Sequence, residues 1–326
     1  VLETRALPGI MDGCKSVQRR IIYAAYQQPN KLMKTANLAG SVMRYHPHGS
    51  SEGAINNMAS PVNPVKLFDI KGNFGGYGYS AAAGRYTECK LSDIARFIFC
   101  QFIDYAEYHE GEIGIQEPVY LPSLLPLALL NGSDGIGVGL STNICPLNVM
   151  DLIDYYIHYI ETGNFDYRIP RPEFGAMVMN QDDESCSNSV REYTGPLWMY
   201  PLIKRESETT FVIESLYGKD ISAVTKKLSW AINDDIVDFR DESSKKERYV
   251  FELVDPKRLS PEELEEYLIK YSKRKETFTR VMVDLDGSAV YTNLNNIIIH
   301  TLEGLNKAID KMIDTQTKKY EKQLEI

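Results

Sequence analysis

The sequence predicts an α+β protein that begins with a helix-turn-helix unit and ends in a long helix. Two short helical stretches, Thr35 to Met43 and Ser50 to Ala59, flank a tight turn, which is the helix-turn-helix pattern. After about residue 151, strand-like and helical stretches follow one another as separate runs, which favours an α+β unit. From about Leu294 one helical pattern continues to the last residue. We therefore expect three regions: 1–150, 151–293 and 294–326.

Length and composition exclude several classes of protein. The chain has 326 residues, 43% of them hydrophobic, which is enough for two domains with cores of their own. No stretch approaches the ~18 uninterrupted apolar residues of a membrane span, so we expect no membrane contact. The five cysteines are scattered and include no CxxC pair, which fits a reducing cytoplasm and argues against a zinc site.

The charge is distributed unevenly along the chain. The net charge is -9, yet residues 1–100 carry 12 Lys and Arg against 6 Asp and Glu, and the remaining residues carry 24 against 39. Residues 101–160 contain eight acids and neither Lys nor Arg. A basic module on an acidic body can bind a polyanion at one face only.

A helix is expected from about Lys15 to Gln28, with Val17, Ile21 and Ala24 or Ala25 as its apolar stripe. Lys15, Arg19 and Arg20 lie off that stripe. They form either a solvated helix face or a phosphate-binding face, and the basic character of this region makes the second as plausible as the first.

The segment 68–91 carries the clearest chemical signal. Five glycines between Gly72 and Gly84 predict a loop that lets the backbone approach a bulky group. Arg85 and Tyr86 stand at its exit, before a run that can form an ordered element. A tyrosine phenol ordinarily has a pKa near 10, and an adjacent cation favours the phenolate, which can attack phosphorus. The alternative is a packing tyrosine, since the chain contains 21 of them.

Of three possible ligand sites, the first is rejected and the other two have only weak support. His46-Pro47-His48 resembles a metal motif, but no cysteine or acid cluster offers the missing ligands, so we expect the histidines to contact phosphate or the phenol. The glycine repeat Gly135 to Gly139 hints at a dinucleotide fingerprint, but Leu140 follows it and the segment continues into Ser-Thr-Asn rather than into a helix. Asp284 and Asp286 precede Gly287, as in a turn. We predict no metal site in this chain.

Ile144 is an apolar residue on a polar loop before a proline. It is either a small core anchor or a wedge that enters a base step and bends DNA. In the last helix, Leu302, Leu305, Ile309 and Met312 repeat with the spacing of a coiled-coil seam. Because the chain ends inside this helix, we expect a fragment of a longer protein.

Four blocks resemble a known family: RALPGIMDGCKSVQRRIIYA, YHPHGSS, KGNFGGYGYSAAAGRYTECKLS and LLNGSDGIGVGLSTNICP. In this order and spacing they are similar to the breakage-reunion subunit of type IIA DNA topoisomerases. That group includes the A subunits of bacterial gyrase and topoisomerase IV and the medium subunit of T-even-type phages. The blocks cover residues 5–146, and DFRDESS at 238–244 extends the likeness.

The resemblance implies a role for each matching position. Tyr86 would be the nucleophile that forms a phosphotyrosyl bond to a DNA 5′ end. Arg85 and Arg5 would hold the scissile phosphate, with His46 and His48 close by. Ile144 would be the DNA wedge, and the expected backbone contacts are Lys15, Arg19, Arg20, Arg44, Ser51 and Lys71.

The resemblance also implies the fold and the assembly. We expect a winged-helix domain over 1–150, a tower domain over 151–293 and the start of a coiled coil over 294–326. The partners would be double-stranded DNA, a second copy of the chain and a Toprim/ATPase subunit, giving a heterotetramer or larger assembly. Mg²⁺ and ATP are expected on that partner subunit, and the location is the cytoplasm of a bacterium or a phage-infected cell.

Some positions depart from the bacterial pattern. The helix after the histidines is about two residues shorter than the gyrase pattern, Gln18 replaces a histidine, and Cys145 replaces a proline. These deviations favour a phage-type enzyme. The rivals are an architectural DNA-binding protein that lacks cleavage and a tyrosine recombinase, which would leave a 3′ phosphotyrosine.

Overall fold

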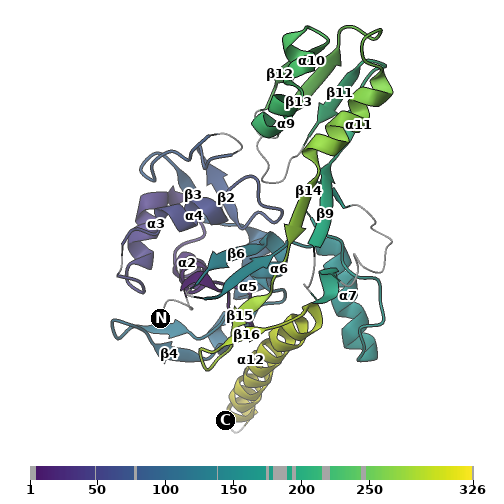
Figure 1. Ribbon diagram of the computed structural model, residues 1–326. Helices are drawn as coiled ribbons and strands as arrows, with labels where there is room; N and C mark the ends of the chain where they lie inside the picture. The colour runs from purple at the N-terminus through teal and green to yellow at the C-terminus, as the bar shows by residue number, and fades with distance from the viewer. Residues whose placement is uncertain are drawn as a thin grey trace.

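The computed structural model describes residues 5–47, 49–76, 79–137, 139–173, 176–178, 189–192, 196–214, 221–243 and 247–324. Figure 1 shows a larger body, a smaller unit that projects from it and a long C-terminal helix. Helices alternate with small antiparallel sheets, so the α+β prediction is confirmed. Among the described residues, no helix is long and apolar enough to cross a membrane.

The three N-terminal helices lie where the sequence predicted them. α2 (Ser16–Tyr26) buries the continuous run Ile21 to Ala25, because it packs against helices on more than one side. α3 (Thr35–Val42) and α4 (Glu52–Met58) form the helix-turn-helix pair and bury Leu38, Val42 and Ile55. Each of the three contacts the other two.

The segment 68–91 is a long loop between two paired strands. β2 (Phe68–Lys71) and β3 (Glu88–Leu91) are antiparallel, and β1 (Met33–Lys34) completes a sheet in the order β1-β3-β2. The ordered element expected after Tyr86 is therefore β3. α5 (Asp93–Cys100) follows at once, capped by the Ser92 hydroxyl, which accepts from the Ala95 N–H at 3.2 Å.

Residues 103–178 complete the body and include a hairpin where a dinucleotide fingerprint had been considered. Gly135 lies in this hairpin, and a Cβ there would lie 2.0 Å from the Ala6 carbonyl oxygen. Only glycine allows this close approach of two backbones. The elements of this part are η1 (Ile103–Tyr105), β4 (Tyr108–Glu110), β5 (Gln116–Pro118), α6 (Leu127–Asn131), the hairpin strands β6 (Ser133–Ile136) and β7 (Ser141–Ile144), α7 (Val149–Thr162) and β8 (Ala176–Val178).

The projecting unit has its own sheet and its own core. Its sheet has the order β10-β11-β13-β12, and one face packs under helices through Phe211, Phe251 and Leu268. Two strands, β9 and β14, join it to the body (Figure 1). The joining strands are β9 (Pro196–Pro201) and β14 (Arg274–Thr277), and the unit's own elements are β10 (Ile203–Arg205), β11 (Thr210–Ile213), α9 (Ile221–Lys227), α10 (Ser229–Asn233), β12 (Val237–Asp241), β13 (Tyr249–Leu253) and α11 (Pro261–Ser272).

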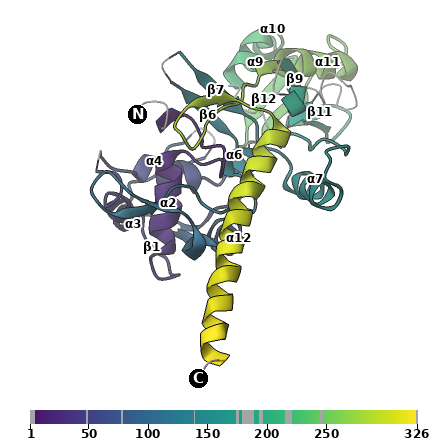
Figure 2. The same cartoon turned by 90° about the horizontal axis from the view of Figure 1, so that it is seen from below.

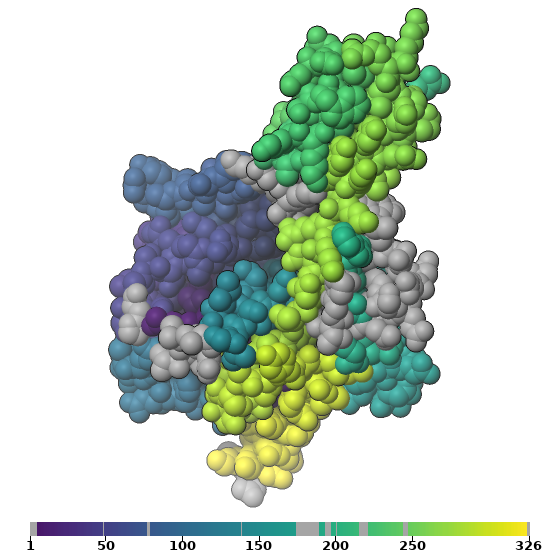
Figure 3. Space-filling view, in the orientation of Figure 1, coloured from purple at the N-terminus to yellow at the C-terminus, as the bar shows by residue number. Residues whose placement is uncertain are grey.

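The boundary expected near residue 150 does not coincide with a break in the core. The second core extends from Ile203 to Tyr271, whereas Leu152, Leu197 and Phe278 belong to the core of the body. The buried residues of α7, Leu152, Tyr155 and Tyr156, lie in this same core. Figure 3 shows the projecting unit standing off from the body.

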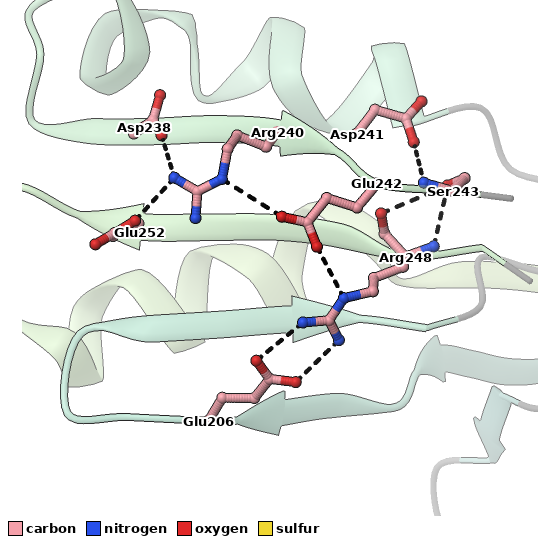
Figure 4. A network of polar contacts seen from close by, with 8 residues as sticks. All are labelled: Glu206, Asp238, Arg240, Asp241, Glu242, Ser243, Arg248 and Glu252. Atoms are coloured by element: carbon pink, nitrogen blue, oxygen red, sulfur yellow. Dashed lines mark hydrogen bonds and ion pairs between the residues drawn. The ribbon is translucent and has the colours of Figure 1, made fainter.

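An ionic network covers the other face of the projecting sheet (Figure 4). Arg240 contacts Asp238 at 2.7 Å and Glu252 at 2.9 Å, and Arg248 contacts Glu206 at 2.9 Å. Their side chains are 35–50% exposed, so each pair contributes little alone. Asp238 and Arg240 of this network belong to the segment DFRDESS, residues 238–244, which extends the family resemblance.

α12 (Leu294–Leu324) is straight and runs past the body (Figure 2). It follows the hairpin β15 (Val281–Val283) and β16 (Ala289–Tyr291). The expected coiled-coil seam includes Leu305, but this residue is 8% exposed and lies on the face that α12 buries as far as Ala308. The first turns of the helix therefore pack within this chain, and a coiled coil with a second chain stays a prediction for the rest.

Candidate DNA-cleavage site

Tyr86 lies on an exposed turn with an arginine over its ring. The Tyr86 side chain is 67% exposed, and the Arg85 guanidinium carbon lies 4.6 Å from the ring centroid. The Tyr86 N–H donates to the Ala83 carbonyl at 2.8 Å, which closes the turn. A phenol in this position is accessible to a large substrate and has a permanent cation beside it.

Both helices of the helix-turn-helix pair hold this turn in place. The Ala36 N–H, in α3, donates to the Gly84 carbonyl at 3.2 Å. The Gly84 N–H donates in turn to the Glu52 carboxylate of α4 at 3.1 Å. One residue beyond Tyr86, the Thr87 carbonyl accepts from the Thr35 N–H at 3.0 Å. Sequence reasoning missed Glu52, since a lone acid after two serines gives no sign that it contacts residue 84.

Four of the predicted site residues meet in a small pocket. Arg5, Arg19, Arg20 and His46 line a cavity of about 230 Å³. Its other lining residues are Ser16, His109, Glu112, Glu117 and Pro118. Arg85 and Tyr86 are not among the residues that line it. The structure thus places the predicted site residues in two groups, the pocket and the tyrosine turn.

Arg20 is the centre of the pocket's polar contacts. Its Nε and Nη2 donate to the two Glu117 oxygens at 2.7 and 2.8 Å. Its Nη1 lies 2.9 Å from His46 Nδ1, and Glu112 lies 3.4 Å away. Burial alone would lower the pKa of Arg20, but the hydrogen bonds and charge of Glu117 outweigh this and raise it. Glu117 was not predicted, because only folding brings it to α2.

Arg19 is paired with a fully buried carboxylate. Its Nε and Nη2 donate to Asp12 at 2.7 and 3.0 Å, and Asp12 also accepts the N–H groups of Cys14 and Leu121. Although burial opposes the charge, Asp12 raises the pKa of Arg19. In this structure Arg19 therefore anchors α2 to the core. A contact between Arg19 and the DNA backbone would have to use the small part of its side chain that is exposed.

The other predicted DNA contacts differ in accessibility. Lys15 donates from Nζ to the Asp134 carbonyl, and burial lowers its pKa. Arg5 and Arg44 are exposed, and Lys71 is 74% exposed beside Glu88. The positive charges of these four side chains lie at or near the surface, where they can bind phosphate.

Two predicted contacts are buried, and one lies outside the described residues. Ser51 is 4% exposed, and its hydroxyl has no hydrogen-bond partner among the described residues. Ile144 is 2% exposed and belongs to the core of the body, so as it stands it cannot enter a base step. Its role as a wedge would require β7 to move, because a wedge must reach the surface. His48 lies outside the described residues.

No group of three or more His, Cys, Asp or Glu side chains that could hold a metal ion occurs in the part of the chain that the structure describes. Asp284 and Asp286 instead accept backbone N–H groups of their own turn, from Leu285 at 2.7 Å and Ser288 at 2.8 Å. That arrangement is an Asx-type turn.

Fold and site together define a protein in which two N-terminal helices hold a turn with an accessible tyrosine, and which has a separate pocket lined by arginines. The family model that describes the A subunit of DNA gyrase and topoisomerase IV matches residues 5–326. The chain is 33% identical over 276 residues to the A subunit of DNA gyrase from Streptomyces coelicolor. The aligned part covers 75% of this chain and 32% of that protein. With the A subunit of DNA gyrase from Escherichia coli the identity is 32% over 273 residues, 75% of this chain and 31% of that protein.

A shorter match has a higher sequence identity. The A subunit of DNA gyrase from Clostridium acetobutylicum is 44% identical over 167 residues, 47% of this chain and 20% of that protein. The chain therefore belongs to the family of DNA gyrase and topoisomerase IV A subunits. Its matched part corresponds to about a third of the length of the Streptomyces and Escherichia relatives.

Proposed function

We propose that this chain is the DNA cleavage and religation part of an ATP-dependent type IIA DNA topoisomerase. The observation that carries the proposal is the exposed Tyr86 with Arg85 over its ring, held by both helices of a helix-turn-helix pair. Membership of the gyrase and topoisomerase IV family supports it. In this proposal the N-terminal unit is a winged helix that binds duplex DNA, and the projecting unit is the tower.

The chemistry needs no cofactor bound to this chain. The Tyr86 Oη attacks a backbone phosphorus and loses its proton to a base. The P–O3′ bond breaks, and the departing 3′ oxygen takes up a proton. The products are a 5′-phosphotyrosyl ester and a free 3′ hydroxyl. Because the ester keeps the energy of the broken bond, the reverse reaction reseals the strand.

Positive charge around the phosphate must stabilise the transition state. We assign this role to Arg85 and Arg5, with hydrogen bonds from His46 and His48. Because Arg85 and Tyr86 do not line the pocket of Arg5 and His46, bringing both groups to one phosphate requires movement or a second chain. The proposed homodimer supplies the second chain.

Mg²⁺ and ATP are assigned to a partner subunit with Toprim and ATPase domains. The described residues do not fit a Mg²⁺ site of their own, since they contain no acid cluster. We therefore expect this chain alone to bind duplex DNA in a salt-dependent way but not to cut it. With the partner subunit it forms a heterotetramer or larger assembly that passes one duplex through another.

Trapping the covalent complex tests the proposal. The chain is mixed with a gyrase B-type subunit, Mg²⁺ and end-labelled duplex DNA, and protein-linked DNA is counted after denaturation. Tyr86→Phe should abolish the linkage and keep DNA affinity, because only the hydroxyl is lost. Tyr79→Phe is the matched control, since Tyr79 is exposed in the same loop. Linkage that survives Tyr86→Phe, or that joins a 3′ phosphate, would refute the assignment.

If the wild-type chain binds and bends DNA but forms no linked product with the partner present, it is an architectural DNA-binding protein. The intact Arg5, Arg85 and Tyr86 favour the enzyme.

A further inference from the structure

We propose that Arg20 and Glu117 are positioning residues that hold His46 as a neutral imidazole with its proton on Nε2. This inference rests on the proposed function, in which His46 acts at the scissile phosphate. It replaces the expectation that Arg20 grips the DNA backbone.

The first step is that the Arg20 guanidinium is already engaged. Its side chain is 12% exposed, and that of Glu117 is 6% exposed. Two parallel hydrogen bonds, at 2.7 and 2.8 Å, fix the plane of the guanidinium against the Glu117 carboxylate. A planar fork held in this bidentate way cannot turn toward an outside phosphate without leaving the buried Glu117 carboxylate only its longer contact with His109, at 3.4 Å.

The second step concerns the proton on His46. Arg20 Nη1 lies 2.9 Å from His46 Nδ1, and a guanidinium can only donate. His46 Nδ1 must therefore accept, so it carries no proton. In a neutral imidazole the proton is then on Nε2. The position of Arg20 thus selects one of the two tautomers of His46.

The third step is the charge around the imidazole. Among the described residues, the ionisable groups that line the same pocket are Arg5, Arg19, Arg20, His109, Glu112 and Glu117. Glu117 is engaged by Arg20, and Arg19 by Asp12. A second proton on His46 would have to lie on Nδ1, facing the Nη1 donor of Arg20. The geometry therefore opposes the imidazolium even where Glu112 favours a cation.

The consequence is a fixed N–H donor. His46 presents Nε2–H in every molecule and over the whole neutral pH range, so it can donate to an anionic oxygen of the phosphate without a change of charge. A preorganised donor of this kind lowers a transition state more than one that must first reorient. Arg20 and Glu117 touch no DNA in this scheme and act only through His46.

Nitrogen NMR of the chain itself tests the tautomer without any activity. The protein is labelled with ¹⁵N-histidine, and the His46 signals are identified by their loss in His46→Ala. We expect shifts of the Nε2–H tautomer that stay constant from pH 8 to pH 5.5. In Arg20→Met the same signals should change over this pH range. A wild-type His46 that titrates normally, or that carries its proton on Nδ1, overturns the inference.

Cleavage with the partner subunit tests the consequence. Arg20→Met should lower the rate of covalent complex formation roughly 10- to 100-fold at pH 8, as for loss of an outer partner of a catalytic group. This loss comes from the freed orientation of the ring, because a neutral imidazole favours the proton on Nε2 even without Arg20. In the His46→Ala background Arg20→Met should have little further effect. An effect that is equally large there refutes the positioning role.

Two further variants separate this role from folding and from DNA binding. Arg20→Met combined with Glu117→Gln avoids a buried carboxylate that has lost its main partner, and it should show the same loss of rate with near-normal stability. Arg44→Met, at an exposed position after α3, should weaken DNA binding and reduce the slope of log affinity against log salt by about 0.9. The same reduction in Arg20→Met would show that Arg20 contacts phosphate and overturn the proposal.

The two hypotheses fail in different ways. If the tautomer of His46 is as inferred but the wild-type chain forms no covalent complex, the proposed function fails and the Arg20–His46 pairing stands. If the wild-type chain forms the complex and Arg20→Met does so at the same rate, the positioning role fails alone.

Discussion

Glu52 occupies the space that a side chain on Gly84 would fill. Its carboxylate accepts the Gly84 N–H at 3.1 Å, and a Cβ on Gly84 would lie 2.7 Å from the carboxylate carbon. Glu52 begins α4, and Gly84 directly precedes Arg85 and Tyr86. The close contact between Glu52 and Gly84 therefore fixes the position of the tyrosine turn relative to α4.

Gly84→Ala should push the Glu52 carboxylate away and break this hydrogen bond. Because the displaced group is the end of a flexible side chain, we expect a loss of about 1 kcal/mol in the free energy of unfolding, measured in urea. Glu52→Ala should cost a similar amount. The double variant should cost less than the sum of the two, because both remove one interaction. Additive losses would mean that the contact contributes nothing.

Arg85→Ala and Arg5→Ala should each lower DNA cleavage roughly 10²-fold or more, as for removal of one donor to a developing oxyanion. Single-turnover cleavage with the partner subunit measures the rate, and fluorescence anisotropy measures DNA affinity. Lys71→Ala, an exposed cation on β2, is the control for loss of charge alone. If affinity falls as far as rate does, these arginines are only phosphate anchors.

Asp12→Asn should destabilise the fold by roughly 3–5 kcal/mol, since it leaves Arg19 without its buried partner. Urea unfolding measures the change. Asp69→Asn is the matched control, because Asp69 pairs with Lys90 at 3.1 Å but is 53% exposed, and we expect at most about 1 kcal/mol there. Equal effects of the two substitutions would contradict the anchoring role of Asp12.

Ile144→Ala separates the core residue from the DNA wedge. With Ile144 2% exposed, we expect a loss of roughly 2–5 kcal/mol in the free energy of unfolding. Ile136→Ala, in the same hairpin but 88% exposed, should change stability little. Bending is measured in parallel by energy transfer between labels on the two DNA ends. Reduced bending without a stability loss would establish Ile144 as the wedge.

Asp151 should make stability depend on pH at the acidic end. The hydrogen bond from Arg171, at 2.6 Å, outweighs the effect of burial and lowers the pKa of Asp151. A lowered pKa means that the stabilisation is complete above the unfolded value of about 3.9 and is lost as pH falls through the folded value. The Tm difference between wild type and Asp151→Asn should be constant from pH 5 to pH 8 and shrink below pH 4. A Tm difference that grows on acidification would contradict the lowered pKa of Asp151.

Local sequence patterns predicted much of the secondary structure. The helices from Lys15, Thr35 and Ser50 agree with α2, α3 and α4 within a few residues. α11 begins at a capping box formed by Ser260 and Glu263, which is a local sequence pattern. Short strands such as β1 and β4 were not predicted, because their pairing partners come from elsewhere in the chain. Two or three residues carry too little periodicity to reveal a strand.

The sequence by itself determined the α+β class, the family and the tyrosine with its neighbouring arginine, because these depend on local periodicity and on residues adjacent in the chain. Only the tertiary structure decided which charged groups pair. Glu117 reaches Arg20 across 97 residues and Glu52 reaches Gly84 across 32, and no local pattern specifies such contacts. The same holds for Ile144, whose burial depends on the segments that pack over it. A cation off an apolar stripe can equally face solvent, phosphate or a buried carboxylate. Tertiary packing pairs Arg19 with Asp12, seven residues away, and Arg20 with the distant Glu117.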